Sequence, residues 1–147
     1  MKYTAQMDTQ RFRKLAEELA AREPDLPERL GRARAAASAL RETVLQAVEA
    51  FRSRAAELGA PQLRNLEVSP VEPDDKHVDA LQFRISRGRL ELLCVAIARG
   101  DGKMRVVGPF KRGKQEGPCA EAGLAGREIE SLLAERLEAL VREASGA

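Results

Sequence analysis

The sequence predicts an α+β fold in which helices lie on one face of an antiparallel meander sheet. Apolar residues recur at three- and four-residue steps in the N-terminal part and again near the C-terminus, and at every second position between them. Turn residues separate the alternating segments at short intervals, as in a meander. Segregated runs of helix and strand favour the α+β class. The length of 147 residues fits a single domain over residues 1–147.

The first element is a predicted helical hairpin over residues 9–59. Asp8 is a suitable N-cap for an amphipathic helix over residues 9–22, which Pro24 ends. A second and much longer helix then runs to Gly59. Its second apolar stripe drifts between intervals of seven and eight residues, which favours ordinary packing in a hairpin over a coiled coil.

The long helix also predicts self-association. At 1.5 Å per residue it is about 48 Å long, more than a sheet region of this size covers completely. Two-fold homodimers are the commonest oligomers, so we expect a homodimer. The candidate contact residues recur every seven positions along the helix and are Leu30, Ala37, Val44 and Phe51.

Residues 62–112 are predicted to form a four-stranded antiparallel sheet. Asp101-Gly102 is the strongest hairpin signal in the chain and separates the last two strands. The strand before it carries apolar residues on both faces, which indicates a central strand. The expected strands cover residues 66–68, 81–85, 90–99 and 103–110.

The C-terminal part is predicted to contain a loop and a helix. A basic, Gly-rich loop over residues 113–126 begins next to Lys111 and Arg112. Residues 127–145 place apolar side chains on one face, which predicts an amphipathic helix packed on the sheet.

Charge is distributed unevenly along a chain whose formal net charge is only +2. Residues 84–114 hold nine basic and two acidic side chains. Cations supply sequence-independent affinity for phosphate. An alternative function is therefore binding of nucleic acid, an acidic protein or a phosphate-bearing anion through the basic sheet face and the loop of residues 108–117. The competing interpretation is solvation of a sheet face and its turns. The candidate anion-binding residues are Arg84, Arg105, Lys111, Arg112, Lys114 and Arg127.

Residues 108–115 match the spacing of a phosphate-binding P-loop up to the last position. Gln115 replaces the Ser or Thr that would ligate magnesium, and Gly117-Pro118 prevents a long helix from starting there. We therefore expect a solvated turn rather than nucleotide chemistry.

The composition offers little for catalysis, with one His and an aromatic content of 3%. Cys119 is the candidate nucleophile of a thiol-dependent enzyme, the second alternative function, but only His77 is available as its base. The carboxylates beside His77 form no recognised ligand set for a metal. We expect no metal, no cofactor and no disulfide between Cys94 and Cys119.

The start of the sequence and its apolar runs predict a cytoplasmic protein without a membrane segment. No apolar stretch follows the first residues, and the longest apolar run, residues 92–98, is too short to span a bilayer. The leading hypothesis is a non-enzymatic cytoplasmic interaction module that self-associates through its helices.

Overall fold

The computed structural model describes residues 8–74, 77–124 and 126–145 and confirms the α+β class. The helices are α1 (Thr9–Arg22), α2 (Leu26–Glu57) and α3 (Arg127–Ala144), with a short 3₁₀ helix η1 (Pro61–Arg64) after α2. The strands are β1 (Glu67–Val68), β2 (Glu72–Pro73), β3 (Ala80–Arg87), β4 (Leu90–Ile97), β5 (Lys103–Lys111) and β6 (Cys119–Ala122).

The sheet is antiparallel throughout, but the prediction of four strands is wrong. The strand order is β1-β3-β4-β5-β6, and β2 pairs with the same strand, β3, further along. The two strands that sequence patterns missed are β2, which contains Pro73, and β6, which lies inside the predicted loop of residues 113–126. Proline is accepted at a sheet edge, where its missing amide hydrogen is not needed. Both short strands form because a long neighbouring strand supplies their hydrogen-bonding partners.

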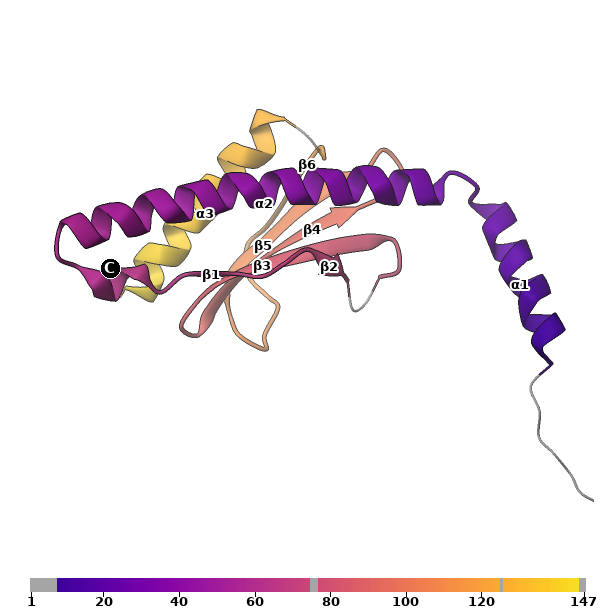
Figure 1. Cartoon of the computed structure of the whole chain (residues 1–147), viewed down its shortest axis with the longest axis horizontal. Coiled ribbons are helices and arrows are strands. Elements are labelled where there is room, and N and C mark those ends of the chain that lie inside the picture. Colours follow the sequence, from indigo (N-terminus) through magenta and orange to yellow (C-terminus); the bar gives the residue numbers. More distant parts are fainter. Residues whose placement is uncertain (1–7, 75–76, 125, 146–147) are drawn as a thin grey trace, which may run out of the picture.

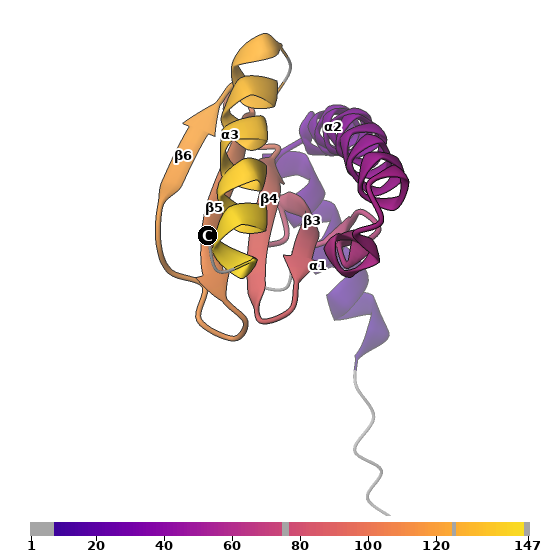
Figure 2. The same cartoon turned by 90° about the vertical axis from the view of Figure 1, so that its left-hand side faces the viewer.

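One face of the sheet carries the main core. Helices α2 and α3 both lie on this face (Figure 2). Phe83 and Ile85 of β3 and Met104 of β5 are buried beneath them. The contacts of α2 are with β3 and β4, and those of α3 extend to β5 and β6. The expectation that the last helix packs on the sheet is confirmed.

Arginines of α2 attach the connection between α2 and the sheet. Arg41 Nε donates to the carbonyl oxygen of Ser69 at 2.7 Å, and Arg52 donates to the carbonyl oxygens of Arg64 and Leu66. From the sequence alone, these charged side chains would be placed in solvent.

The predicted hairpin of α1 and α2 is wrong. Helix α1 projects from the N-terminal end of α2, away from the sheet (Figure 1). None of the residues of α1 is buried. An ion pair attaches the C-terminal end of α1 to the end of β4: Arg99 Nη2 lies 2.8 Å from Oε2 of Glu23, the residue after the helix. The amide of Leu26 donates to the carbonyl oxygen of Glu23 at 3.1 Å, so the connection between the helices is a tight turn.

Within the described residues, no helix has the combination of length and apolar character that crossing a bilayer requires.

Candidate interaction surfaces

Helix α1 presents an apolar surface that no other part of the described chain covers. Asp8 caps the helix by accepting hydrogen bonds from the amides of Gln10 and Arg11. Phe12, Leu15 and Leu19 follow at helical spacing on one side and are 53%, 42% and 51% exposed. We call these three side chains the α1 stripe. It is a continuous apolar surface of the kind that marks a contact with another molecule.

The α1 stripe continues into a hollow at the corner between α1 and α2. Leu19 lines this hollow together with Leu26 and Leu30 of α2. Val78, from the connection to β3, adds an exposed apolar side chain to its wall. The apolar surface therefore extends around the corner onto the first turns of α2.

A second apolar surface is the groove between the C-terminal halves of α2 and α3, which has a volume of about 440 Å³. Val48 and Leu66 form its buried floor, and the half-buried Phe51, Leu137 and Val141 form its walls. We call this hollow the helix groove. Its remaining lining residues are Ala47, Ala134, Glu138 and Arg142.

The four predicted self-association residues divide between the core and these surfaces. Ala37 and Val44 are 1% and 3% exposed because they pack against the sheet of their own chain. Their prediction as contact residues between copies is therefore wrong: they belong to the core of their own chain. Leu30 lines the corner hollow, and Phe51 lines the helix groove. Only these two remain available to a second molecule.

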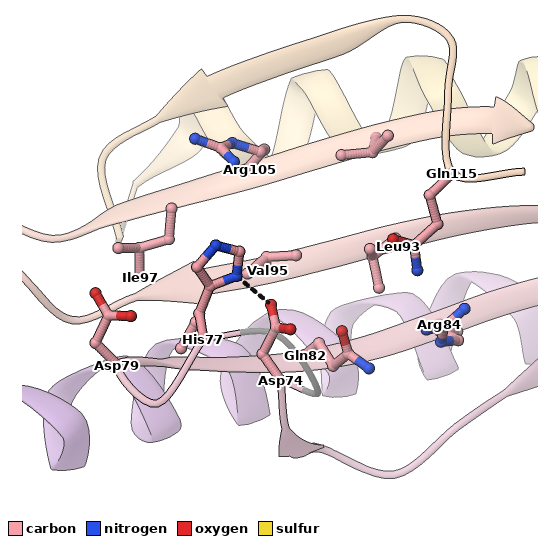
Figure 3. A pocket seen from close by; sticks show the side chains of 12 residues that line it. Asp74, His77, Asp79, Gln82, Arg84, Leu93, Val95, Ile97, Arg105 and Gln115 are labelled. Atoms are coloured by element: carbon pink, nitrogen blue, oxygen red, sulfur yellow. Dashed lines mark ion pairs between the residues drawn. The ribbon is translucent and has the colours of Figure 1, made fainter.

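The sheet face opposite the helices carries a hollow of about 380 Å³ (Figure 3). Leu93, Val95 and Val107 form an apolar floor at its centre. The amide side chain of Gln82 lies beside this floor, although the residue is only 3% exposed. The other lining residues are Asp74, His77, Asp79, Ala80, Arg84, Ile97, Arg105 and Gln115.

Two predicted anion-binding residues on this face share one intramolecular carboxylate. Arg84 Nη1 lies 3.0 Å from Glu91 Oε2, and Arg112 Nε lies 3.0 Å from Glu91 Oε1. The Glu91 side chain is largely buried, so both arginines are held by a fixed negative charge. The positive charge of this part of the sheet is therefore partly neutralised within the fold.

Arg105 is paired in the same way with Glu121 of β6. Its Nη2 lies 2.7 Å from Glu121 Oε1, and Lys103 Nζ lies 3.6 Å from Glu121 Oε2. The hydrogen bond and the charge of Arg105 hold the pKa of the Glu121 carboxyl below its usual value, with a smaller contribution from Lys103. The carboxylate therefore stays charged, and its contribution to stability is lost only as pH falls through this lowered pKa.

The remaining predicted anion-binding residues are not brought together. Lys111 and Lys114 are exposed at the end of β5 and in the turn after it. Arg127 begins α3, at the opposite end of β6 from that turn (Figure 1). The amides of Lys114 and Glu116 donate to carbonyl oxygens of the turn itself, so they are not directed at an anion. Helix α3 starts only at Arg127, which leaves the P-loop-like segment without the helix that phosphate binding needs.

The proposed thiol chemistry also lacks a suitable geometry. Cys119 lies on β6, at one edge of the sheet, whereas His77 precedes β3 at the other, with β4 and β5 between them. His77 Nδ1 lies 3.6 Å from Asp74 Oδ2. In the described part of the chain, no group of three or more His, Cys, Asp or Glu residues is arranged to hold a metal ion.

The two cysteines are expected to react with iodoacetamide at very different rates. Both are free, and burial raises the pKa of the Cys94 thiol to about 12. At pH 7.5 Cys94 then has almost no thiolate and no access to reagent, whereas Cys119 is exposed. Mass spectrometry should find Cys119 modified in the folded protein and Cys94 modified only after denaturation. Rapid labelling of Cys94 in the folded protein would contradict its place in the core.

No family model matches the chain, and neither the curated proteins nor the solved structures include a significant match to it. The chemistry of its surfaces is therefore the basis for a functional proposal.

The α1 stripe is the surface whose role the sequence left unidentified. Its helical spacing is plain, but the same spacing fits a helix packed within a hairpin. The signal that distinguishes the two lies in α2, where Ala33, Ala37 and Leu40 form one narrow buried face. This face packs on the sheet of the same chain and not on α1.

Proposed function

We propose that this protein is a non-enzymatic cytoplasmic interaction module that self-associates through its helices. The observation that carries the proposal is the α1 stripe, three large apolar side chains on a helix with no buried residue. A helix of 14 residues is marginal in water by itself, and most helices in proteins are stabilised by packing an amphipathic face. Contact with a second molecule supplies that packing.

A second copy of the chain is the partner that the surfaces favour. The molecule carries both an exposed apolar helix and separate apolar hollows, so one copy offers what the other needs. In a two-fold dimer each interaction occurs twice, so even a small helical contact contributes twice to the free energy of association. The anion-binding alternative has weaker support, because Arg84, Arg105 and Arg112 are paired with carboxylates of the same chain.

The proposal is tested with two variants of α1 that differ only in the face they change. Leu15→Gln/Leu19→Gln removes most of the α1 stripe. The control, Lys14→Gln/Glu17→Gln, places two glutamines on the opposite face of α1 without changing the net charge. Glutamine is a good helix former, so the intrinsic helix propensity of α1 is similar in both variants. We expect light scattering to show a dimer for the wild type and the control, and a monomer for the stripe variant.

The stripe variant should raise the dimer dissociation constant by at least about 100-fold, since two leucines are lost from each of two contacts. Equal association of the stripe variant and the wild type would exclude the α1 stripe as the contact.

A further inference from the structure

We propose that the hollow on the open face of the sheet binds a small, neutral, planar molecule with an amide-like group, and that Gln82 is its hydrogen-bonding partner. We call this hollow the sheet hollow; Figure 3 draws its lining residues. The ligand class comprises carboxamides, lactams and ureas, which carry a donor and an acceptor on a flat frame. The sheet hollow lies on the face opposite α2 and α3, so this inference does not depend on self-association.

The sheet arranges the central lining residues in two rows that run across the strands. Gln82 of β3 is paired with Val95 of β4, which is paired in turn with Arg105 of β5. The second row holds Arg84, Leu93 and Val107 in the same strand order. Residues two apart on a strand point to the same face, so both rows line the sheet hollow. The central strand therefore supplies an apolar floor, and polar side chains flank it.

Gln82 is a polar side chain that the fold encloses without giving it a partner. The residue is 3% exposed, yet within the described part of the chain its side-chain amide makes no hydrogen bond. Among the described residues, no side-chain nitrogen or oxygen is both fully enclosed and without a partner, so the amide of Gln82 keeps access to the sheet hollow. A largely buried amide without a partner destabilises a fold. A ligand that hydrogen-bonds to this amide removes that cost.

The charged side chains that line the sheet hollow already have partners. The pairs are Arg84 with Glu91, Arg105 with Glu121, Asp79 with Arg99, and Asp74 with His77. Arg112 and Lys103 share two of these carboxylates but do not line the hollow. The lining itself holds two aspartates and two arginines, whose formal charges balance. A charged ligand would compete with these partners, whereas a neutral one needs only hydrogen bonds.

The shape of the sheet hollow suits a flat molecule. Leu93, Val95 and Val107 form the apolar floor, and the volume of about 380 Å³ lies in the range of small-molecule sites. Gln115 extends from the loop after β5 toward Leu93 and brings a second amide to the hollow (Figure 3). A few placed polar groups over an apolar surface are what orients a small ligand.

Benzamide is the probe for this ligand class, in ¹H–¹⁵N NMR titrations of the full chain. It should shift the side-chain NH₂ signals of Gln82 and the backbone amide signals of Val95 and Val107, with a dissociation constant of about 1 mM. N,N-dimethylbenzamide has no N–H donor and should bind at least about tenfold more weakly.

A pair of methionine variants tests the role of Gln82. Gln82→Met replaces the amide by an apolar side chain of similar length and should weaken benzamide binding at least about tenfold. The control, Gln46→Met, makes the same change at an exposed position of α2 and should bind like the wild type. Because the amide of Gln82 has no partner within the described fold, Gln82→Met should unfold at the same temperature as the wild type or at a higher one. Loss of binding is then separate from loss of structure.

Three results would overturn the inference. The first is tighter binding of benzoate than of benzamide, equal in the wild type and Gln82→Met, which would make the arginines the recognition groups. The second is a large drop in the unfolding temperature of Gln82→Met, which would give the amide a structural role. The third is unchanged NH₂ signals of Gln82 up to the solubility limit of benzamide. The variant Leu15→Gln/Leu19→Gln should bind benzamide like the wild type, so failure of this site and failure of self-association are distinguishable.

Discussion

The variant Val44→Asp is expected to unfold much of the protein rather than to separate a dimer. Val44 is 3% exposed beneath α2, in the core cluster that joins α2 to the sheet. An aspartate there either keeps a buried charge without a partner or is protonated at a cost in free energy, and in both cases it loses the packing of valine. We expect a loss of more than about 4 kcal/mol, a large part of a typical domain stability.

Circular dichroism during heating measures this effect, and Thr43→Asp is the matched control. Thr43 is the preceding residue of the same helix, also β-branched, and exposed. Its replacement should change stability by less than about 0.5 kcal/mol. If Val44→Asp unfolded at the temperature of the control, the sheet-facing orientation of α2 would be wrong.

The second large effect is expected for Phe83→Ala, compared with the same change at Phe12. Phe83 is fully buried on β3 in the main core. Removing its ring leaves a cavity and should lower the free energy of unfolding by about 3–5 kcal/mol. Phe12 is 53% exposed on α1, so Phe12→Ala should change the stability of the monomer by less than about 0.5 kcal/mol.

Urea denaturation at low protein concentration measures both variants, because dilution removes the contribution of dimerisation to stability. Phe12→Ala should instead weaken association, by about tenfold or more in the dissociation constant. A large loss of monomer stability in Phe12→Ala would show that α1 packs within its own chain. Full stability of Phe83→Ala would contradict the core on the helix-covered face of the sheet.

Elements with strong local signals could be predicted from the sequence. The α1 helix begins after Asp8 and ends before Pro24, and α2 ends before Gly59, because capping, proline and glycine act over a few residues. A hairpin joins β4 and β5 where Asp101-Gly102 predicts a turn, but the connection spans residues 98–102 instead of two residues. The amide of Gly102 donates to the carbonyl oxygen of Arg99, which places Gly100 and Asp101 at the centre of the turn.

Elements that depend on distant partners could not be predicted. The segment of β6 is Cys-Ala-Glu-Ala, which has little preference for a strand, and it pairs because β5 offers a long free edge. Helical periodicity shows that α1 has an apolar face but does not show what covers that face. The partners of Arg84 and Arg105 were also hidden, because Glu91 and Glu121 lie in other strands.

If the chain associates with itself through the α1 stripe, the mass of the wild-type protein in solution depends on its concentration. Sedimentation equilibrium over a range from nanomolar to high micromolar concentration should show a reversible transition from the chain mass of 16.1 kDa to twice that value. A mass of 16.1 kDa throughout this range would contradict self-association.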